Sequence, residues 1–184
     1  PDWSRGLGDV YKRQKYIKMK NLILSITALF ITLSVSSQTI VDAAASNKDF
    51  STLVTALKAA DLVGALSGEG PFTVFAPNND AFGKIDSETL GSLLKPENVE
   101  ALSNILTYHV VSGKLMASDV TKALKDGYGR VKLTALNGQT FVARSKGGKI
   151  FLKDQNGDMS EVIATDVVGT NGVIHVIDSV IMPE

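Results

Sequence analysis

The sequence predicts an α+β domain, and three observations lead to that class. Apolar residues recur at helical spacing through the first half of the region that begins at residue 38. Short runs rich in β-branched and aromatic residues, separated by Asn-Gly and Gly-Gly pairs, fill its second half. No internal repeat and no long linker divides residues 38–184, so helices followed by antiparallel strands indicate one compact domain.

Helices are expected in the first half because each has a start signal and an apolar face. Asn47 or Asp49 can cap a helix with apolar positions at i, i+3, i+4, i+7 and i+10. Asp86 and Pro96 open two more helices, and a fourth ends before Gly127. The apolar face of the first helix is formed by Phe50, Leu53, Val54, Leu57 and Ala60, extended by Leu62, Val63 and Leu66, and that of the third by Val99, Leu102, Ile105 and Leu106.

A strand that passes directly into a helix is predicted at Thr73–Phe82. Thr73–Phe75 are β-forming residues, and Pro77 ends the strand because it lacks an N–H and fixes φ at about −65°. Asn78–Asp80 can accept backbone N–H groups at the start of the helix that follows.

The second half reads as short strands joined by tight turns. Asn137-Gly138 predicts a type I′ hairpin turn, and Gly147-Gly148 and Asn156-Gly157 mark two further turns. The expected strands cover residues 131–136, 140–144, 149–153, 161–168 and 173–181.

Two further segments complete a family resemblance. Leu106–Val111 carries a Tyr-His pair where a helix runs into an extended stretch, and Asn171–Pro183 reads as a turn feeding an alternating strand closed by a proline. Together with Thr73–Phe82, and in this order, these segments resemble the signatures of the fasciclin domain. The similarity covers roughly Thr39–Glu184.

The resemblance implies a fasciclin-like single domain over 38–184, with helices packed on a β-sandwich or wedge of short, mostly antiparallel strands. It also implies a secreted or cell-surface module, not an enzyme, that mediates cell adhesion, extracellular-matrix or biofilm contacts. Its partner would be an extracellular protein or glycan. Many relatives carry several such domains in tandem, whereas one is found here, which argues against multivalent bridging. A monomer is expected. The alternative function is an extracellular carrier or sensor of a small hydrophobic or saccharide ligand.

The first 37 residues are interpreted separately from the domain. Met19 opens a short basic region, followed by an apolar run from Leu22 to Val35 and by small residues that suit cleavage. This layout predicts a secretory signal peptide over 19–37. The apolar run of 14 residues is shorter than the roughly 20 of a membrane span, which favours cleavage over the alternative of a retained anchor. Residues 1–18 are interpreted as an unstructured leader of upstream or non-native origin.

Composition excludes several classes of function. Residues 38–184 carry 13 Lys and Arg against 17 Asp and Glu, a formal net charge of −4, which gives a nucleic-acid role no support. The chain has no cysteine, so a secreted domain must be held by its own core. The same absence removes thiol nucleophiles, cysteine zinc sites, iron–sulfur clusters and a lipid anchor.

Three residues are candidates for binding because they match adhesive motifs of the family. Tyr108 and His109 form the Tyr-His pair, and Asp119 with Val120 resembles a short acidic-aliphatic motif. A structural role is the favoured interpretation for each. The apolar neighbours of the Tyr-His pair indicate burial with satisfied hydrogen bonds. Asp119 suits the first turn of a helix.

No catalytic, metal or cofactor site is predicted. His175 and Asp178 lie an odd number of residues apart on an expected strand, so their side chains would point to opposite faces, and no Gly-x-Ser-x-Gly elbow occurs. Asp154–Asp158 lacks the spacing of a calcium loop and is interpreted as a polar hairpin turn. Two histidines far apart in sequence give a zinc site little support.

Overall fold

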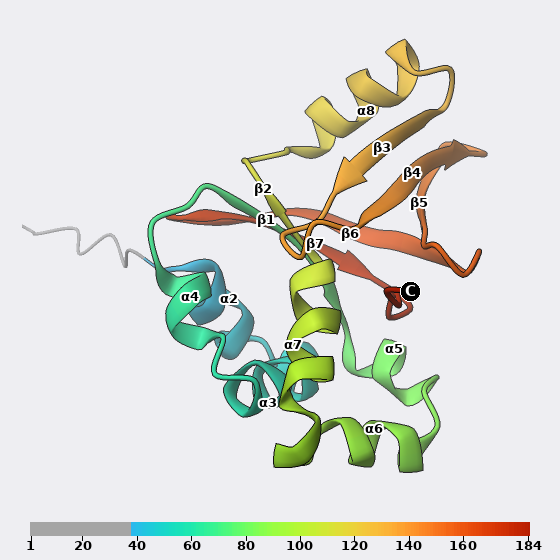
Figure 1. The fold of residues 1–184 in the computed structure, drawn as a ribbon. Coiled ribbons are helices and arrows are strands. Elements are labelled where there is room, and N and C mark those ends of the chain that lie inside the picture. Colours follow the sequence, from blue (N-terminus) through green and yellow to red (C-terminus); the bar gives the residue numbers. More distant parts are fainter. Residues whose placement is uncertain (1–37) are drawn as a thin grey trace, which may run out of the picture. The chain divides into compact units, whose positions relative to one another are not determined.

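The computed structural model describes residues 38–184, so the predicted leader (1–18) and signal peptide (19–37) lie outside the described residues. Helices and strands are both present, which confirms the α+β class (Figure 1). No helix within 38–184 is long and apolar enough to cross a membrane. In chain order, with η for 3-10 helices, the elements are α2 (Ile40–Ser46), η1 (Lys48–Phe50), α3 (Ser51–Ala59), α4 (Val63–Ser67), β1 (Phe72–Pro77), α5 (Asn79–Gly83), α6 (Ser87–Leu93), η2 (Pro96–Asn98), α7 (Val99–Tyr108), β2 (Val110–Ser112), α8 (Ala117–Asp126), β3 (Arg130–Thr134), β4 (Thr140–Lys146), β5 (Lys149–Lys153), β6 (Met159–Gly169) and β7 (Gly172–Ile177).

The seven strands form one mixed sheet that curves into a wedge. Their order is β2-β1-β7-β6-β5-β4-β3. Among the described strands only β1 and β7 pair in parallel, and every other neighbouring pair is antiparallel. A single bridge between Val111 and Ala135 brings the two outermost strands together at one point. The strands therefore form the wedge that the family resemblance implies, and its two outer strands meet at this bridge.

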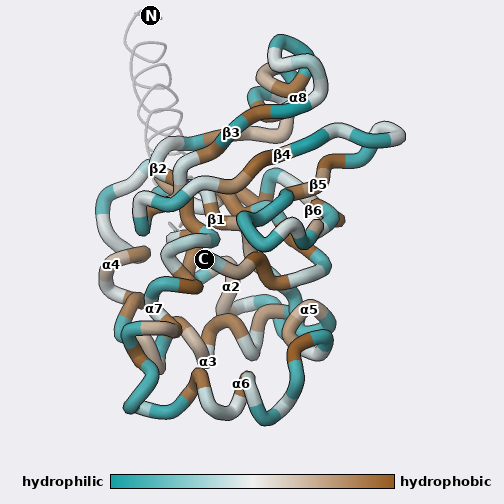
Figure 2. Tube along the Cα trace, turned by 45° about the vertical axis from the view of Figure 1, so that its right-hand side comes forward, coloured by the Kyte–Doolittle hydropathy of each residue, from teal (hydrophilic) through white to brown (hydrophobic). Residues whose placement is uncertain are grey.

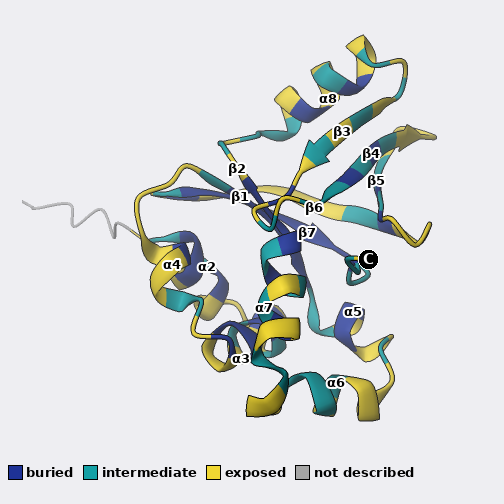
Figure 3. Cartoon of the chain, in the orientation of Figure 1, coloured by how far each residue is buried: buried dark blue, intermediate teal, exposed yellow. Residues whose placement is uncertain are grey.

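Two hydrophobic cores lie on opposite sides of the central strands. The first is built from α2, α3, α4 and α7 against β1 and β7, with Phe50, Leu102 and Ile174 among its buried residues. The second fills the wedge, where Val120 and Leu124 of α8 pack among strand residues. All six residues of β7 are buried, as its dark blue colour in Figure 3 shows. The expected alternation along this strand is wrong, because both of its faces are covered.

The Thr73–Phe82 segment forms the predicted strand and helix. Pro77 is the last residue of β1, and the Asn78 side chain accepts the Ala81 N–H at 2.8 Å to cap α5. The Asn79 amide has a second role: its oxygen accepts the Thr52 N–H at 3.1 Å and its nitrogen donates to the Lys48 carbonyl at 2.9 Å. The segment therefore joins the sheet to the α3 region as well as starting a helix.

The first helix is shorter than its apolar pattern predicts. Asp61 adopts a left-handed conformation with φ of 54°, so the chain breaks between α3 and α4. Leu62, Val63 and Leu66 therefore lie beyond the break instead of extending α3. Helix α2, which the sequence analysis does not include, precedes both. Its start is fixed by a reciprocal capping box between Thr39 and Asp42.

One hairpin turn differs from its predicted type. At Asn137-Gly138 only the glycine has a positive φ, of 85°, so the predicted type I′ turn is wrong, since that turn needs two positive φ angles. The turn between β4 and β5 has φ of 60° at Gly147 and 79° at Gly148, as a type I′ turn requires. The loop between β3 and β4 is longer, and Ala135 N–H donates to the Gln139 carbonyl across it at 2.8 Å.

Three aromatic rings form the centre of the wedge core. Phe75 and Tyr108 each meet Phe141 edge to face, with ring centroids 5.5 and 5.6 Å apart. Phe141 is 1% exposed and reaches this cluster from β4, so it links the strands of the second half to β1 and α7.

Phe141→Ala should lower the free energy of unfolding by about 3–5 kcal/mol, because it removes the shared ring of this cluster and leaves a cavity. Leu136→Ala is the matched control, since Leu136 is 44% exposed, and it should change stability by less than about 1 kcal/mol. Urea denaturation followed by circular dichroism measures both values. Equal losses in the two variants would contradict a central role for Phe141.

Candidate functional site

The Tyr108-His109 pair lies where α7 ends and the chain turns into β2. Tyr108 is 0% exposed and His109 is 2% exposed, so both side chains are inside the domain. The backbone carbonyl of His109 accepts the Phe75 N–H at 2.8 Å, which ties this junction to β1. Burial of the pair matches the prediction from its apolar neighbours. Its role in binding stays a prediction.

Both ring nitrogens of His109 have backbone partners. Nδ1 lies 2.8 Å from the Ile105 carbonyl and Nε2 lies 3.1 Å from the Ile181 N–H. These partners assign the neutral tautomer, with the proton on Nδ1 donated to Ile105 and Nε2 accepting from Ile181. Burial lowers the pKa of His109 from 6.5 to about 4, although the Ile105 carbonyl acts in the opposite direction. The imidazole thus joins α7 to the C-terminal segment as an uncharged group.

Tyr108 is held by the wedge core. Its hydroxyl donates to the Thr140 carbonyl at 3.1 Å, while its ring contacts Phe141. Burial raises the pKa of Tyr108, and the negative charge of Asp154 raises it further. The side chain therefore remains neutral and connects α7 to β4.

Asp119 lies in the first turn of α8 and is exposed. Its carboxylate accepts the Met116 N–H at 3.0 Å, so it satisfies a backbone donor at the helix start, as predicted. Figure 1 shows α8 and α7 on opposite sides of the strands, and Asp119 shares no hydrogen bond with the Tyr-His pair within 38–184. The structure therefore does not gather the three candidate residues into one surface patch, and a binding role for Asp119 also stays a prediction.

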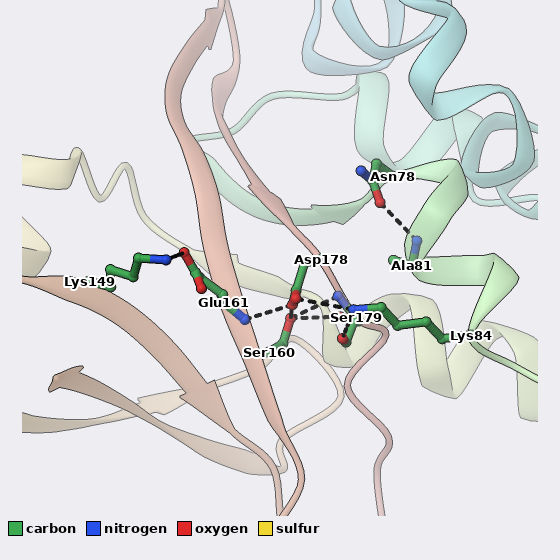
Figure 4. A network of polar contacts seen from close by, with 8 residues as sticks. All are labelled: Asn78, Ala81, Lys84, Lys149, Ser160, Glu161, Asp178 and Ser179. Atoms are coloured by element: carbon green, nitrogen blue, oxygen red, sulfur yellow. Dashed lines mark hydrogen bonds and ion pairs between the residues drawn. The ribbon is translucent and has the colours of Figure 1, made fainter. Parts of the chain in front are cut away.

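Asp178 lies just beyond β7 and forms a polar network that joins distant elements (Figure 4). Its carboxylate accepts the Glu161 N–H at 2.8 Å and the Ser160 hydroxyl at 3.3 Å, and pairs with the Lys84 ammonium at 3.1 Å. Burial alone would raise the pKa of Asp178, but the Glu161 N–H and the Lys84 charge lower it on balance. These contacts give Asp178 a structural role at the end of β7.

His175 has different partners from Asp178, so the two do not form part of a hydrolytic triad. Its Nε2 lies 2.7 Å from the Leu115 carbonyl, and its Nδ1 accepts the Asp166 N–H at 3.4 Å. The ring also packs against Phe75 at a centroid distance of 5.5 Å. In the part of the chain that the structure describes, neither imidazole has a serine hydroxyl among its hydrogen-bond partners.

Asp154–Asp158 forms the hairpin turn that the sequence predicts. The Asp158 N–H donates to the Asp154 carboxylate at 2.9 Å, and the second carboxylate oxygen of Asp154 accepts the Met182 N–H at 3.1 Å. Residues 38–184 hold no group of three or more His, Cys, Asp or Glu placed to bind a metal ion.

A basic surface absent from the sequence predictions lies on β3, β4 and β5. Residues 130–153 contain six Lys and Arg and no Asp or Glu, which is the signal that could have revealed it. The register places Arg130 opposite Arg144 and Lys146 opposite Lys149, and directly opposite residues share a face of the sheet. Since side chains alternate along each strand, all six cations share one face. We call it the basic strand face, and it consists of Arg130, Lys132, Arg144, Lys146, Lys149 and Lys153.

A hollow of about 300 Å³ lies at one end of the basic strand face. Three of its lining residues are cationic: Arg130, Arg144 and Lys146. Tyr128, 97% exposed, lines it as well. The Nε atom of Arg144 is buried and has no hydrogen-bond partner among the described residues. This arrangement suits an anionic group, because guanidinium N–H donors recognise carboxylate, sulfate and phosphate oxygens.

Two apolar cavities among the described residues are small. They measure about 20 Å³, beside Leu53 and Ile174, and about 10 Å³, beside Phe75 and His175. Pockets for small molecules usually measure roughly 300–1,000 Å³, so these volumes disfavour a carrier of a hydrophobic ligand. A larger hollow of about 570 Å³ lies at the surface around 67–71 and 170–172.

The seven-stranded wedge and its buried Tyr-His junction define a domain of the fasciclin type. The model of the Fasciclin domain family matches residues 48–183, and the chain therefore belongs to this family. The match confirms the resemblance found in the three sequence segments.

Relatives of known sequence and structure agree with this assignment. The Synechocystis protein sll1483 is 50% identical over 148 residues, which is 80% of this chain and 75% of the relative. Human periostin is 36% identical over 141 residues, 74% of this chain but 15% of the relative. A solved FAS1 domain pair from the insect cell adhesion molecule Fasciclin I has a TM-score of 0.54 at 22% identity, over 71% of this chain and 43% of that one, and it supports the fold.

The stability of the domain should depend on pH through His109. The folded-state pKa of about 4 lies below the ordinary value of 6.5, so folding favours the neutral imidazole. The stabilisation is complete above about pH 6.5 and is lost as the pH falls towards 4, by about 3 kcal/mol over that window. Urea midpoints measured between pH 7 and pH 4 should therefore fall more steeply for the native protein than for His109→Gln. Parallel curves would show that the imidazole is not the group responsible.

Proposed function

We propose that this chain is an extracellular interaction module that mediates cell adhesion, matrix or biofilm contacts without catalysis. The observation that carries the proposal is its membership of the fasciclin domain family, together with a fold shared with an insect cell adhesion molecule. In this proposal the chain is exported through a cleaved signal peptide and acts at the cell surface, in the periplasm or in the medium. It acts as a monomer, and its partner is an extracellular protein or glycan.

The buried polar groups support a non-catalytic role. A general base needs an accessible ring nitrogen near a substrate. Both nitrogens of His109 are occupied by backbone groups, and so are those of His175. These imidazoles hold elements together, which leaves exposed surface to make contacts with a partner.

Surfaces coated with the purified protein should retain more cells than surfaces coated with the same protein after heat denaturation, because a folded surface makes the contact. Attachment of bacterial cells and of cultured animal cells is counted after washing, with albumin-coated wells as the blank. Equal retention on folded and denatured protein for both cell types would contradict the adhesive role.

His109→Ala should lower stability by about 2–4 kcal/mol, because it leaves the Ile105 carbonyl and the Ile181 N–H without partners inside the domain. Cell attachment per folded molecule should remain unchanged at a temperature where the variant is folded. Thermal melts and the attachment assay are run on the same preparation. A variant of native stability that no longer retains cells would instead make His109 a binding residue.

A further inference from the structure

The basic strand face has a charge opposite to that of the domain as a whole. Residues 38–184 carry a net charge of −4, whereas the segment 130–153 contributes six positive charges and no negative one. The segment reaches from β3 to the end of β5, and β4 becomes hydrophilic towards the hairpin that leads to β5 (Figure 2). The strand register then gathers these charges on one side of the sheet.

The positive charges on this face repel one another in the folded protein. Arg130 lies directly opposite Arg144, and Lys146 directly opposite Lys149, an arrangement that destabilises a sheet. Lys149 is compensated by an ion pair with Glu161 at 2.7 Å. Within 38–184 no ion pair compensates the other five cations of the face. A bound anion would remove this repulsion.

The hollow at the end of the face contains two features that folding alone does not explain. The buried Nε atom of Arg144 has no hydrogen-bond acceptor among the described residues, which is unfavourable for a buried donor. Tyr128 stands 97% exposed with φ of 53°, a conformation that is unfavourable for a bulky residue. An anionic ligand would balance the three cations that line the hollow, and a sugar ring would supply a surface for the tyrosine.

We propose that the basic strand face binds an acidic polysaccharide, with one carboxylate or sulfate group in the hollow between Arg130, Arg144 and Lys146. Tyr128 then covers a neighbouring sugar ring. This assignment rests on the proposed extracellular role and names the chemistry of the partner.

The geometry favours a polysaccharide over other polyanions. Alternate residues on a strand stand about 6.6 Å apart and neighbouring strands about 4.8 Å apart, so the cations match anionic groups repeated along a chain. A membrane surface would require several protruding apolar anchors, whereas Val142 and Phe151 between the charges are half-buried. Apart from Tyr128, Met159 is the one exposed apolar side chain that lines the hollow among the described residues. Single-stranded nucleic acid stacks successive bases on several aromatic rings, and Tyr128 is the one exposed ring on this side within the described residues.

Binding is measured by biolayer interferometry with the full chain immobilised. The probes are heparin for sulfate, polygalacturonate for carboxylate and dextran as the neutral control. We expect binding to one or both acidic polymers and none to dextran. The affinity should fall at least about tenfold between 50 and 300 mM NaCl, because the contacts are ionic and solvent-accessible. Binding to dextran, or an affinity that does not change with salt, overturns the proposal.

Two matched variants locate the contact. Arg130→Gln with Lys146→Gln removes two exposed cations from the hollow and should weaken binding to the acidic polymer at least about tenfold. Lys58→Gln with Lys95→Gln removes the same charge from the exposed helical side and should change the affinity less than about twofold. An equal loss in both pairs means that net charge alone drives binding and overturns the assignment.

A third variant separates binding from folding. Tyr128→Gly places glycine where φ is positive, so the thermal midpoint should stay the same or rise while polymer binding weakens about threefold. Unchanged binding in this variant overturns the role of Tyr128.

Tighter binding to phosphatidylglycerol vesicles or to duplex DNA than to either acidic polymer overturns the choice of polysaccharide. A protein that retains cells but binds no acidic polymer contradicts this inference and leaves the adhesive function standing.

Discussion

The parallel pairing of β1 with β7 is the constraint on which the rest of the structure depends. Phe72 to Pro77 align with Gly172 to Ile177, so two segments about 100 residues apart become the centre of the sheet. Both strands are covered on both sides, by the helices on one and by the wedge core on the other. Each core therefore packs against one face of this strand pair.

The polar groups of the third signature segment, Asn171–Pro183, serve this centre. Asn171, at the turn into β7, accepts the Ile40 N–H at 2.9 Å and donates to the Leu66 carbonyl at 2.7 Å, which fastens α2 and α4 to the sheet. Asp178 fastens α5 and β6 in the same way at the other end of the strand. The signature segments thus build the scaffold. The basic strand face on β3, β4 and β5 lies outside them, so it is the surface that we propose for a partner.

Local signals in the sequence predicted a large part of the fold. Pro77, Asn78 and Gly127 ended or began elements where expected, because each acts through its own backbone. The parallel pairing and the full burial of β7 could not be read in this way, since they depend on contacts between distant segments. The burial of His109 followed from its apolar neighbours, but its partner Ile181 is 72 residues away. The basic strand face required the register, because only the pairing shows that cations on three strands share one side.

The single bridge between Val111 and Ala135 leaves the outer edges of the sheet largely unpaired. Such edges can recruit strands from other molecules and start aggregation. Here β2 is three residues long, and β3 places Arg130 and Lys132 along its length. Short or charged edges discourage this pairing. The domain contains no cysteine, so no disulfide can hold these edges together. The short length of β2 and the charges of β3 therefore discourage the growth of fibres at high local concentration.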